Sequence, residues 1–528
     1  QSVRPAEGGN PRTKVLWHIG PDTGTLAHNL SVALVASQQD RRLSDGVDIK
    51  IESSMEYLPL AVVSTVFREC GLNAALAGMH RGRSAKAPFE QVVEALVIQR
   101  CVCPDSKLGF QRWRADTALA EVTETRSESL HNSRVHRVLD ELTKVQGKLE
   151  DWTWTHGVKG GIQALYLDLT DTWFEHGGGS LARKGETKEG HRYKRKIHIE
   201  LVVDQRGMPL SWRLLPGVLN ETTVLPGAID RLGDRPGAED AVLIFDRGMV
   251  SAKNLAQLNE EEPRRLFLTT VKSDAIPTYI KVDEDGMDRL QSLGEGARAG
   301  EIEAVCRSLN MSHVSQNTWG VDLGIVEVPA PRDKRASSPG HLRAYMYFNR
   351  DIQLTRRQGR SERLERAYAE LSLLNEELGN ARQPRKLAAV ERKVGRILDR
   401  YSLNEVIEVR IEPHAVQRAR KAIASFRVTM TQNAKRLAEM ARFDGVTLAV
   451  GHPQLSYDLP TAIEAYRHKD VVEAGFKTIK SVLEIRPVYH RKDEKIAAHV
   501  TLCVMGLLVE RLIEQRLHDA VKAGRKCS

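Results

Sequence analysis

The chain has 528 residues, of which 41% are hydrophobic and 28% charged, so it is long enough for several folded domains and is not of disordered composition. Its 78 Lys and Arg against 69 Asp and Glu give a net charge of +9, a modest excess that permits a polyanionic partner without requiring one. The six cysteines show no CxxC or Cys/His zinc spacing, and no apolar run is long enough to cross a bilayer. These features exclude a disulfide-stapled secreted protein and predict a cytoplasmic protein with no membrane partner.

Residues 1–155 predict a helical N-terminal domain behind a polar leader. Apolar residues recur with a period near that of an α-helix in Phe89–Cys101 and in Ser133–Leu149. Pro104 and its polar neighbours mark a break between helices. This part of the chain indicates no activity by itself.

The pattern changes after Gly161 from helical to extended. Ile162–Leu169 is almost wholly apolar and β-rich, and two further strand patterns flank the turn Asp204–Gly207, as in a hairpin. Helical segments then alternate with buried strand patterns, which indicates an α/β layer with a mixed sheet over residues 156–271. The later elements that we expect here are Lys196–Val203, Pro209–Leu215, Leu225–Leu232, Ala241–Phe245, Leu255–Glu262 and Arg265–Val271.

Residues 272–445 interrupt this layer. They contain a strand pattern at Trp319–Val328 and a long charged helix whose apolar stripe runs from Leu364 to Leu378. Because the segment is too long for a loop inside a compact domain, we expect an inserted subdomain. The layer resumes over residues 446–528, which end in a predicted helix at Ile496–Leu517.

Ala465–Ser481 (AYRHKDVVEAGFKTIKS) has the clearest chemistry in the chain. Wound as one α-helix, it brings four polar side chains within an arc of roughly 60°, beside an apolar face. A carboxylate flanked by cations suits a metal ion next to phosphates, because lysines neutralise charge that the ion does not. The alternative is a solvated face on which Lys469 pairs with Glu473. The four residues of the arc are Tyr466, Lys469, Glu473 and Lys480.

Two aspartates stand at the ends of apolar strand patterns, where an open α/β sheet presents its ligand groups. Asp168 lies in YLDLTDTWF and Asp246 in VLIFDRG. Each can instead cap the next turn, and Asp171 competes with Asp168 for the first position. Together with Glu473, Asp168 and Asp246 form a set of hard oxygen ligands, which selects Mg²⁺ or Mn²⁺. Two such ions about 3.5–4 Å apart activate a water or a 3′-hydroxyl and stabilise the leaving oxygen of a phosphodiester.

In these stretches the chain resembles the DDE transposases of bacterial insertion sequences, in the cut-and-paste branch that carries a Y-x2-R-x3-E-x6-K signature. Tyr466, Lys469, Glu473 and Lys480 match this signature, with lysine in place of arginine. That exchange keeps the charge but loses the bidentate fork. The other matching stretches are YLDLTDTWFEH, FDRGM, the tail KSVLEIRPVYHRKDEKIAAHV and, in the N-terminal part, RCVCPDSKLGFQRW.

The resemblance implies an α/β, RNase H-like catalytic core that is interrupted by a largely β-stranded insertion and preceded by the helical N-terminal domain. It also implies that Asp168, Asp246 and Glu473 are the catalytic metal ligands, holding two Mg²⁺ ions that Mn²⁺ can replace. The signature's tyrosine and lysines are then expected on phosphates of the transposon ends. For the basic run at 192–196, a solvated strand edge is the alternative to DNA contact. The residues that we expect to contact DNA are Tyr466, Lys469, Lys480, Arg192, Lys194 and Lys196.

The chain is therefore expected to be a metal-dependent transposase that cuts and joins DNA at the ends of its own mobile element. Its expected partners are double-stranded DNA, at terminal repeats and at a target, and a second copy of the chain in a synaptic complex. We expect it in the cytoplasm, associated with the bacterial nucleoid. The alternatives are a structure-specific nuclease of the same fold without strand transfer, and a non-catalytic DNA-binding protein derived from a transposase.

Overall fold

The computed structural model describes Ser2–Val3, Arg12–Thr13 and residues 55–524, except for 81–87, 192, 234, 236, 238, 261–265, 329–339, 419–420 and 487. The chain divides into two compact units, and each is described by itself. The first unit comprises Gln1–Val224, Asp234–Leu243 and His468–Ser528, and the second comprises Leu225–Gly233 and Ile244–Arg467. The chain is mixed α/β with a mostly helical N-terminal region. The four-part division expected from the sequence stays a prediction.

The helices of the N-terminal region gather around α4, which covers the predicted Phe89–Cys101 and is buried along most of its length. α4 contacts α2, α3, α7 and the C-terminal helix α18. The predicted helix at Ser133–Leu149 is confirmed as part of α7, which runs ten residues further. The helices of this region are α2 (Leu58–Glu69), α3 (Leu72–Met79), α4 (Phe89–Val102), α5 (Lys107–Trp113), α6 (Leu119–Val122) and α7 (Asn132–Lys159), with 3-10 turns at η1 (Arg114–Asp116) and η2 (Ser127–Leu130).

The strands of the first unit form an antiparallel layer centred on β5. β3 lies along one edge of β5, and β4 and β6 follow each other along the opposite edge. The predicted hairpin is confirmed as β5 and β6, and Gly207 closes its turn with φ of 78°, a conformation that glycine adopts without steric cost. The strands are β3 (Ala164–Phe174), β4 (Arg183–Gly185), β5 (Lys194–Asp204) and β6 (Pro209–Leu215). A 3-10 turn, η3 (Glu221–Thr223), follows them.

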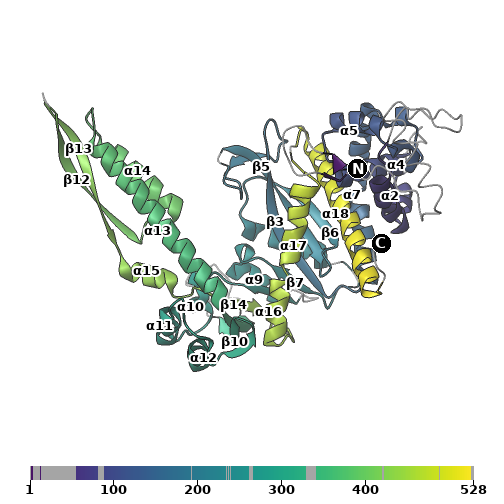
Figure 1. The fold of residues 1–528 in the computed structure, drawn as a ribbon. Helices are drawn as coiled ribbons and strands as arrows, with labels where there is room; N and C mark the ends of the chain where they lie inside the picture. Colours follow the sequence, from purple (N-terminus) through teal and green to yellow (C-terminus); the bar gives the residue numbers. More distant parts are fainter. Residues whose placement is uncertain are drawn as a thin grey trace. The chain divides into compact units, whose positions relative to one another are not determined.

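Three C-terminal elements complete the first unit: α17 (Asp470–Lys477), a π-turn η6 (Thr478–Val482) and α18 (Asp493–Lys522). α17 contacts β3 and β5, while α18 packs on α7, α4 and β6 (Figure 1). α18 has the length and apolarity of a membrane-crossing helix, but 72% of its apolar window is buried inside the structure. That burial is typical of a core helix in a soluble protein.

The second unit contains an antiparallel run of strands in the order β8-β14-β11-β10-β9. The predicted strand Trp319–Val328 is confirmed as β10, so this part of the expected insertion extends a sheet. β7 (Val242–Phe245) crosses the boundary between the units. The strands of the run are β8 (Phe267–Thr270), β9 (Ser312–Ser315), β10 (Thr318–Val328), β11 (Gly340–Asn349) and β14 (Val446–Gly451). The shorter helices of this unit are α8 (Leu225–Gly233), η4 (Arg247–Met249), α9 (Ala252–Glu260), η5 (Ser273–Ala275), α10 (Ile276–Tyr279), α11 (Glu284–Ser292), α12 (Ala299–Ser308), α15 (Ala434–Ala441) and α16 (Leu459–Arg467).

Two long helices and a two-stranded ribbon form an arm within the second unit (Figure 1). Its elements are α13 (Arg350–Gly379), α14 (Leu387–Tyr401), β12 (Ile407–Arg418) and β13 (Lys421–Gln432). The apolar stripe predicted on α13 is buried against α14 and the ribbon, as Leu371, Leu374 and Leu378 show. The expectation of a largely β-stranded insertion was wrong, because α13 and α14 alone contribute 30 and 15 residues of helix. α13 and α14 bury their apolar faces by packing against each other and against the ribbon.

Candidate active site

Asp168 lies within β3, at the fifth of its eleven residues, and not at the strand end that the sequence predicted. β3 continues because Thr170–Phe174 pairs with β5, as far as Phe174 opposite Arg195. Asp168 is half-buried, and its Oδ1 accepts a hydrogen bond from the Leu169 N–H at 2.7 Å. A carboxylate therefore stands in the middle of a rigid strand.

Asp171 has a different environment. It is three residues further along β3 and so points to the opposite face of the strand from Asp168. Its side chain is 1% exposed, its Oδ2 lies 3.2 Å from the Lys196 ammonium, and it accepts from the Lys188 N–H at 2.8 Å. Lys196 is itself buried beside this carboxylate, so the alternative of a solvated strand edge does not hold for it, and its expected contact with DNA stays a prediction.

Asp246 follows β7 directly, as the sequence predicted, and belongs to the second unit. Its side chain caps the 3-10 turn η4 by accepting from the Gly248 N–H at 3.4 Å. This cap is long for a hydrogen bond, so it constrains the carboxylate only weakly. Both sequence-based interpretations of Asp246, a turn cap and a ligand group after a strand, fit its position.

The signature segment is not the single helix that was expected. α16 ends at Arg467, and α17 begins at Asp470 after a turn in which the Val471 N–H donates to His468 O at 3.0 Å. The His468 ring lies 2.7 Å from Gln205 O and meets the Tyr166 ring edge-on, at 5.5 Å between centroids. These tertiary contacts hold His468 on the sheet of the first unit and interrupt the helix there.

The break separates the tyrosine of the signature from its other residues. Tyr466 lies in the second unit, where its hydroxyl accepts from Thr270 Oγ1 at 2.8 Å. Lys469 and Glu473 lie at the start of α17, and Lys480 lies in the π-turn that follows. The apolar face predicted for the segment is nevertheless buried at four of its residues, Val472, Phe476, Ile479 and Leu483.

Lys469 and Glu473 form the ion pair that the alternative interpretation of the sequence predicted. Lys469 Nζ lies 2.8 Å from Glu473 Oε1; the lysine side chain is 10% exposed and the glutamate side chain 57%. The carboxylate is therefore accessible to a ligand, while its cation is held beneath the helix surface.

Lys480 belongs to a charged cluster that also contains Glu189, Arg486 and Trp173. Glu189 Oε1 lies 3.5 Å from Lys480 Nζ and 2.6 Å from an Arg486 nitrogen. The Arg486 hydrogen bonds are the main cause of a lowered pKa of Glu189, to about 2, while burial lowers the pKa of Lys480. The Trp173 indole donates to Glu189 at 3.4 Å.

Sequence reasoning did not single out Glu189 and Arg486. Arg486 stands in the tail stretch that matches the family, and Glu189 stands in the loop before β5. The only signal for either residue in the sequence was its charge within that stretch.

The basic run at the start of β5 is described only in part. Lys194 forms an ion pair with Glu175 and lies 4.8 Å from the centroid of the Trp173 ring, while Arg486 lies 5.3 Å from the same ring. Lys194 is thus a half-buried cation on an aromatic face. Arg192 lies outside the described residues.

The three expected metal ligands are distributed over both units: Asp168 and Glu473 in the first and Asp246 in the second. Within the described residues no group of three or more His, Cys, Asp or Glu side chains gathers in a metal-binding arrangement. The chemistry of the set still fits a hard divalent cation, because all three donors are carboxylates and none of the three residues is fully buried.

A sequence profile of the family described as "Transposase DDE domain" matches residues 167–509, which is well over half of the chain. The chain belongs to this transposase family. No curated protein matches it. Among solved structures, this transposase is similar to a piggyBac transposase in a synaptic complex with hairpin DNA, at 10% sequence identity and a TM-score of 0.36, over 90% of this chain and 77% of that one. Family membership indicates an enzyme that cuts and joins DNA with divalent metal ions.

Proposed function

We propose that this transposase cuts DNA at the ends of its own mobile element, a bacterial insertion sequence, and joins the freed ends to target DNA. The observation that carries the proposal is the content of the family match. Residues 167–509 contain Asp168 on a strand, Asp246 directly after a strand and Glu473 on a helix, the three residues that the sequence resemblance assigns to the metal site. The core is proposed to be RNase H-like, and the packing of α17 on β3 within the first unit supports this.

Asp168, Asp246 and Glu473 are the proposed ligands of two divalent cations, Mg²⁺ with Mn²⁺ as a substitute. Such ions, when bound, supply a nucleophile at neutral pH and stabilise the leaving oxygen of a phosphodiester. Asp168 is preferred over Asp171 because Asp171 is buried and already neutralised by Lys196. An ion at Asp171 would need to displace that ammonium from the interior.

The reaction proposed is two successive phosphoryl transfers. Water first cleaves one strand at the element end, and the freed 3′-hydroxyl then attacks a second phosphodiester, in the opposite strand or in a target. Each step replaces one P–O bond with another, so positioning and charge neutralisation are the main demands on the protein. The proposed contacts of the end phosphates are three residues of the signature, Tyr466, Lys469 and Lys480.

Lys469 has a second role in this proposal. Its ammonium lies 2.8 Å from Glu473 Oε1, so it orients the carboxylate until a cation competes for it. Because two element ends must be cut in concert, a second copy of the chain is the proposed partner on DNA. The proposed location is the cytoplasm, at the nucleoid.

The test is an incubation of the purified protein with a DNA fragment that carries its native element end and flank, in Mg²⁺ or Mn²⁺. Asp246→Asn is run in parallel, and products are separated on a denaturing gel into nicked, hairpin and joined strands. Cleavage at the end followed by joining, both lost in the variant, is the expected result. Nicking without any joined strand would replace the proposal with a nuclease, and binding without cleavage would replace it with a DNA-binding protein.

A further inference from the structure

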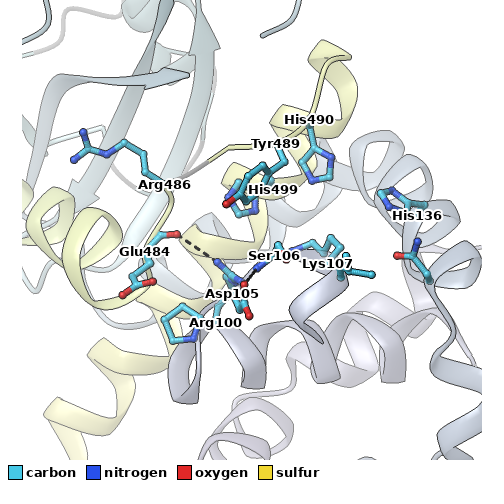
Figure 2. Close-up of a pocket in the computed structure, with 13 residues that line it drawn as sticks. Arg100, Asp105, Ser106, Lys107, His136, Glu484, Arg486, Tyr489, His490 and His499 are labelled. Atoms are coloured by element: carbon cyan, nitrogen blue, oxygen red, sulfur yellow. Dashed lines mark hydrogen bonds between the residues drawn. The ribbon is translucent and has the colours of Figure 1, made fainter. Parts of the chain in front are cut away.

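A cavity of about 630 Å³ opens within the first unit, where the break between α4 and α5 meets the tail before α18 (Figure 2). None of the expected catalytic or DNA-contacting residues lines it. Its size far exceeds that of an inorganic ion and falls in the usual range of small-molecule sites, about 300–1,000 Å³. The lining residues that carry the argument are Arg100, Lys107, His136, Tyr489, His490 and His499.

Two buried cations line the cavity. Arg100 is 2% exposed; its terminal nitrogens reach only carbonyl and amide oxygens at 3.4–3.5 Å, and its buried Nε has no hydrogen-bond partner in the part of the chain that the structure describes. Lys107 is 6% exposed, and among the described residues its ammonium has no ion-pair or hydrogen-bond partner. Burying these two groups together in their charged forms is unfavourable unless an anion accompanies them.

Three imidazoles form a row beside these cations. The His490 ring lies 5.9 Å from the His136 ring and 5.9 Å from the His499 ring, both in edge contacts. Burial lowers the pKa of all three histidines, that of His490 to about 4, so the row is neutral at pH 7. It therefore offers rings and hydrogen-bonding nitrogens without adding charge.

His499 has one nitrogen left for a ligand. Its Nε2 lies 2.9 Å from Ile485 O, and since a carbonyl only accepts, Nε2 carries the hydrogen. Its buried Nδ1 is then an acceptor, and within the described residues nothing donates to it. A donor such as the N–H of a nucleobase would satisfy it.

We propose that this cavity binds a nucleotide, with its phosphate against Arg100 and Lys107 and its base among the imidazoles and Tyr489. A phosphate supplies the negative charge that the two cations lack, and the Arg100 fork suits its oxygens. The exposed ring of Tyr489 adds a stacking surface. Asp105 and Glu484 also line the cavity, but both are exposed and so remain solvated.

The nucleotide has two sources with the same chemistry, a free nucleotide or the 5′-phosphorylated end of a DNA strand. The proposal does not depend on cleavage, so its test is done on the whole protein without metal. Isothermal titration with thymidine 5′-monophosphate is compared with thymidine, which lacks the phosphate. We expect the monophosphate to bind at least about tenfold more tightly, which corresponds to roughly 1.4 kcal/mol.

Lys107→Met removes one buried charge at similar length and is expected to weaken monophosphate binding by a further factor of about ten. The matched control is Lys148→Met, at an exposed lysine of α7 in the same unit, which should bind as the unsubstituted chain does. Thermal unfolding of each variant establishes that it is folded. Equal binding of thymidine and its monophosphate, no binding of either, or unchanged affinity in folded Lys107→Met would each overturn the proposal.

A 5′-phosphorylated tetrathymidylate distinguishes the two sources. Tighter binding of this strand than of the monophosphate, with the same dependence on Lys107, assigns the site to a DNA strand end. Equal affinity assigns it to a free nucleotide. Either result supports a nucleotide site, and neither bears on whether Glu473 and the two aspartates catalyse cleavage.

Discussion

The ammonium of Lys469 lies 2.8 Å from Oε1 of Glu473, four residues further along the chain, at the start of α17. The lysine is buried and the carboxylate faces solvent, so the pair is inaccessible on one side and open on the other. A purely structural surface pair would ordinarily contribute little, about 0–1 kcal/mol. Here the arrangement also holds a carboxylate where a cation can reach it, which is why Glu473 is the first residue to test.

Glu473→Gln keeps the shape of the side chain and removes its charge. We expect strand cleavage to fall by at least about a thousandfold, on the order of 4 kcal/mol of transition-state stabilisation, with binding to the element end retained. Cleavage rates on denaturing gels and a gel-shift assay measure the two effects. Glu464→Gln, at an exposed carboxylate of α16, is the control and should cleave normally. Cleavage that survives in Glu473→Gln would remove this residue from the metal site.

Lys480→Ala tests the proposed contact with DNA phosphates. We expect weaker binding to the element end and a shallower dependence of log affinity on log salt, by about 0.9 for one lost phosphate contact. Fluorescence anisotropy over a salt series measures the slope. Lys522→Ala, at the exposed end of α18, should leave it unchanged. If the two variants gave the same slope, Lys480 would serve only the cluster with Glu189.

Asp171→Asn separates a structural aspartate from a catalytic one. The substitution leaves the buried Lys196 without its charge partner, so we expect the free energy of unfolding to drop by roughly 3 kcal/mol. Cleavage per folded molecule should be largely retained. Denaturant unfolding and a cleavage assay on the folded fraction report the two quantities, with the exposed Asp519→Asn as control. Complete loss of cleavage in a folded variant would make Asp171 the first metal ligand.

Lys107→Met should stabilise the protein in a pH-dependent way. Burial lowers the pKa of Lys107 from 10.5 to about 7. Between these two pH values the Lys107 amine is therefore protonated in the unfolded chain and neutral in the folded chain. The burial cost is full below pH 7 and is relieved as the pH rises toward 10.5. The gain from Lys107→Met should therefore be largest below pH 7, on the order of a few kcal/mol, and should fade above it. The other titratable groups that act with Lys107 are Arg100, His136, His490, His499 and Cys503.

Thermal unfolding of Lys107→Met and the unsubstituted chain over this pH range measures the difference. A gain that is constant with pH would mean that Lys107 keeps its ordinary pKa in the folded chain. Lys148→Met, at an exposed site, is expected to show no gain at any pH.

The order of many elements and the transposase family could be predicted from the sequence, because both depend on local patterns. Strand and helix periodicities located α4, α8, the β5–β6 hairpin, β7 and β10 to within a few residues. The residues around Glu473 carried the family resemblance, and the family match over residues 167–509 confirmed the transposase assignment. Short-range propensity and residue type suffice for such features.

Three other features of the structure were decided by tertiary contacts alone. β3 extends to Phe174 because β5 pairs with it, the signature helix breaks because His468 is held by Gln205 and Tyr166, and Lys196 is internal because Asp171 neutralises it. The cavity likewise joins residues near position 100 to residues near 490. Each depends on partners distant in the chain, whose burial and pairing energies outweigh local preference and leave no periodic trace in the sequence.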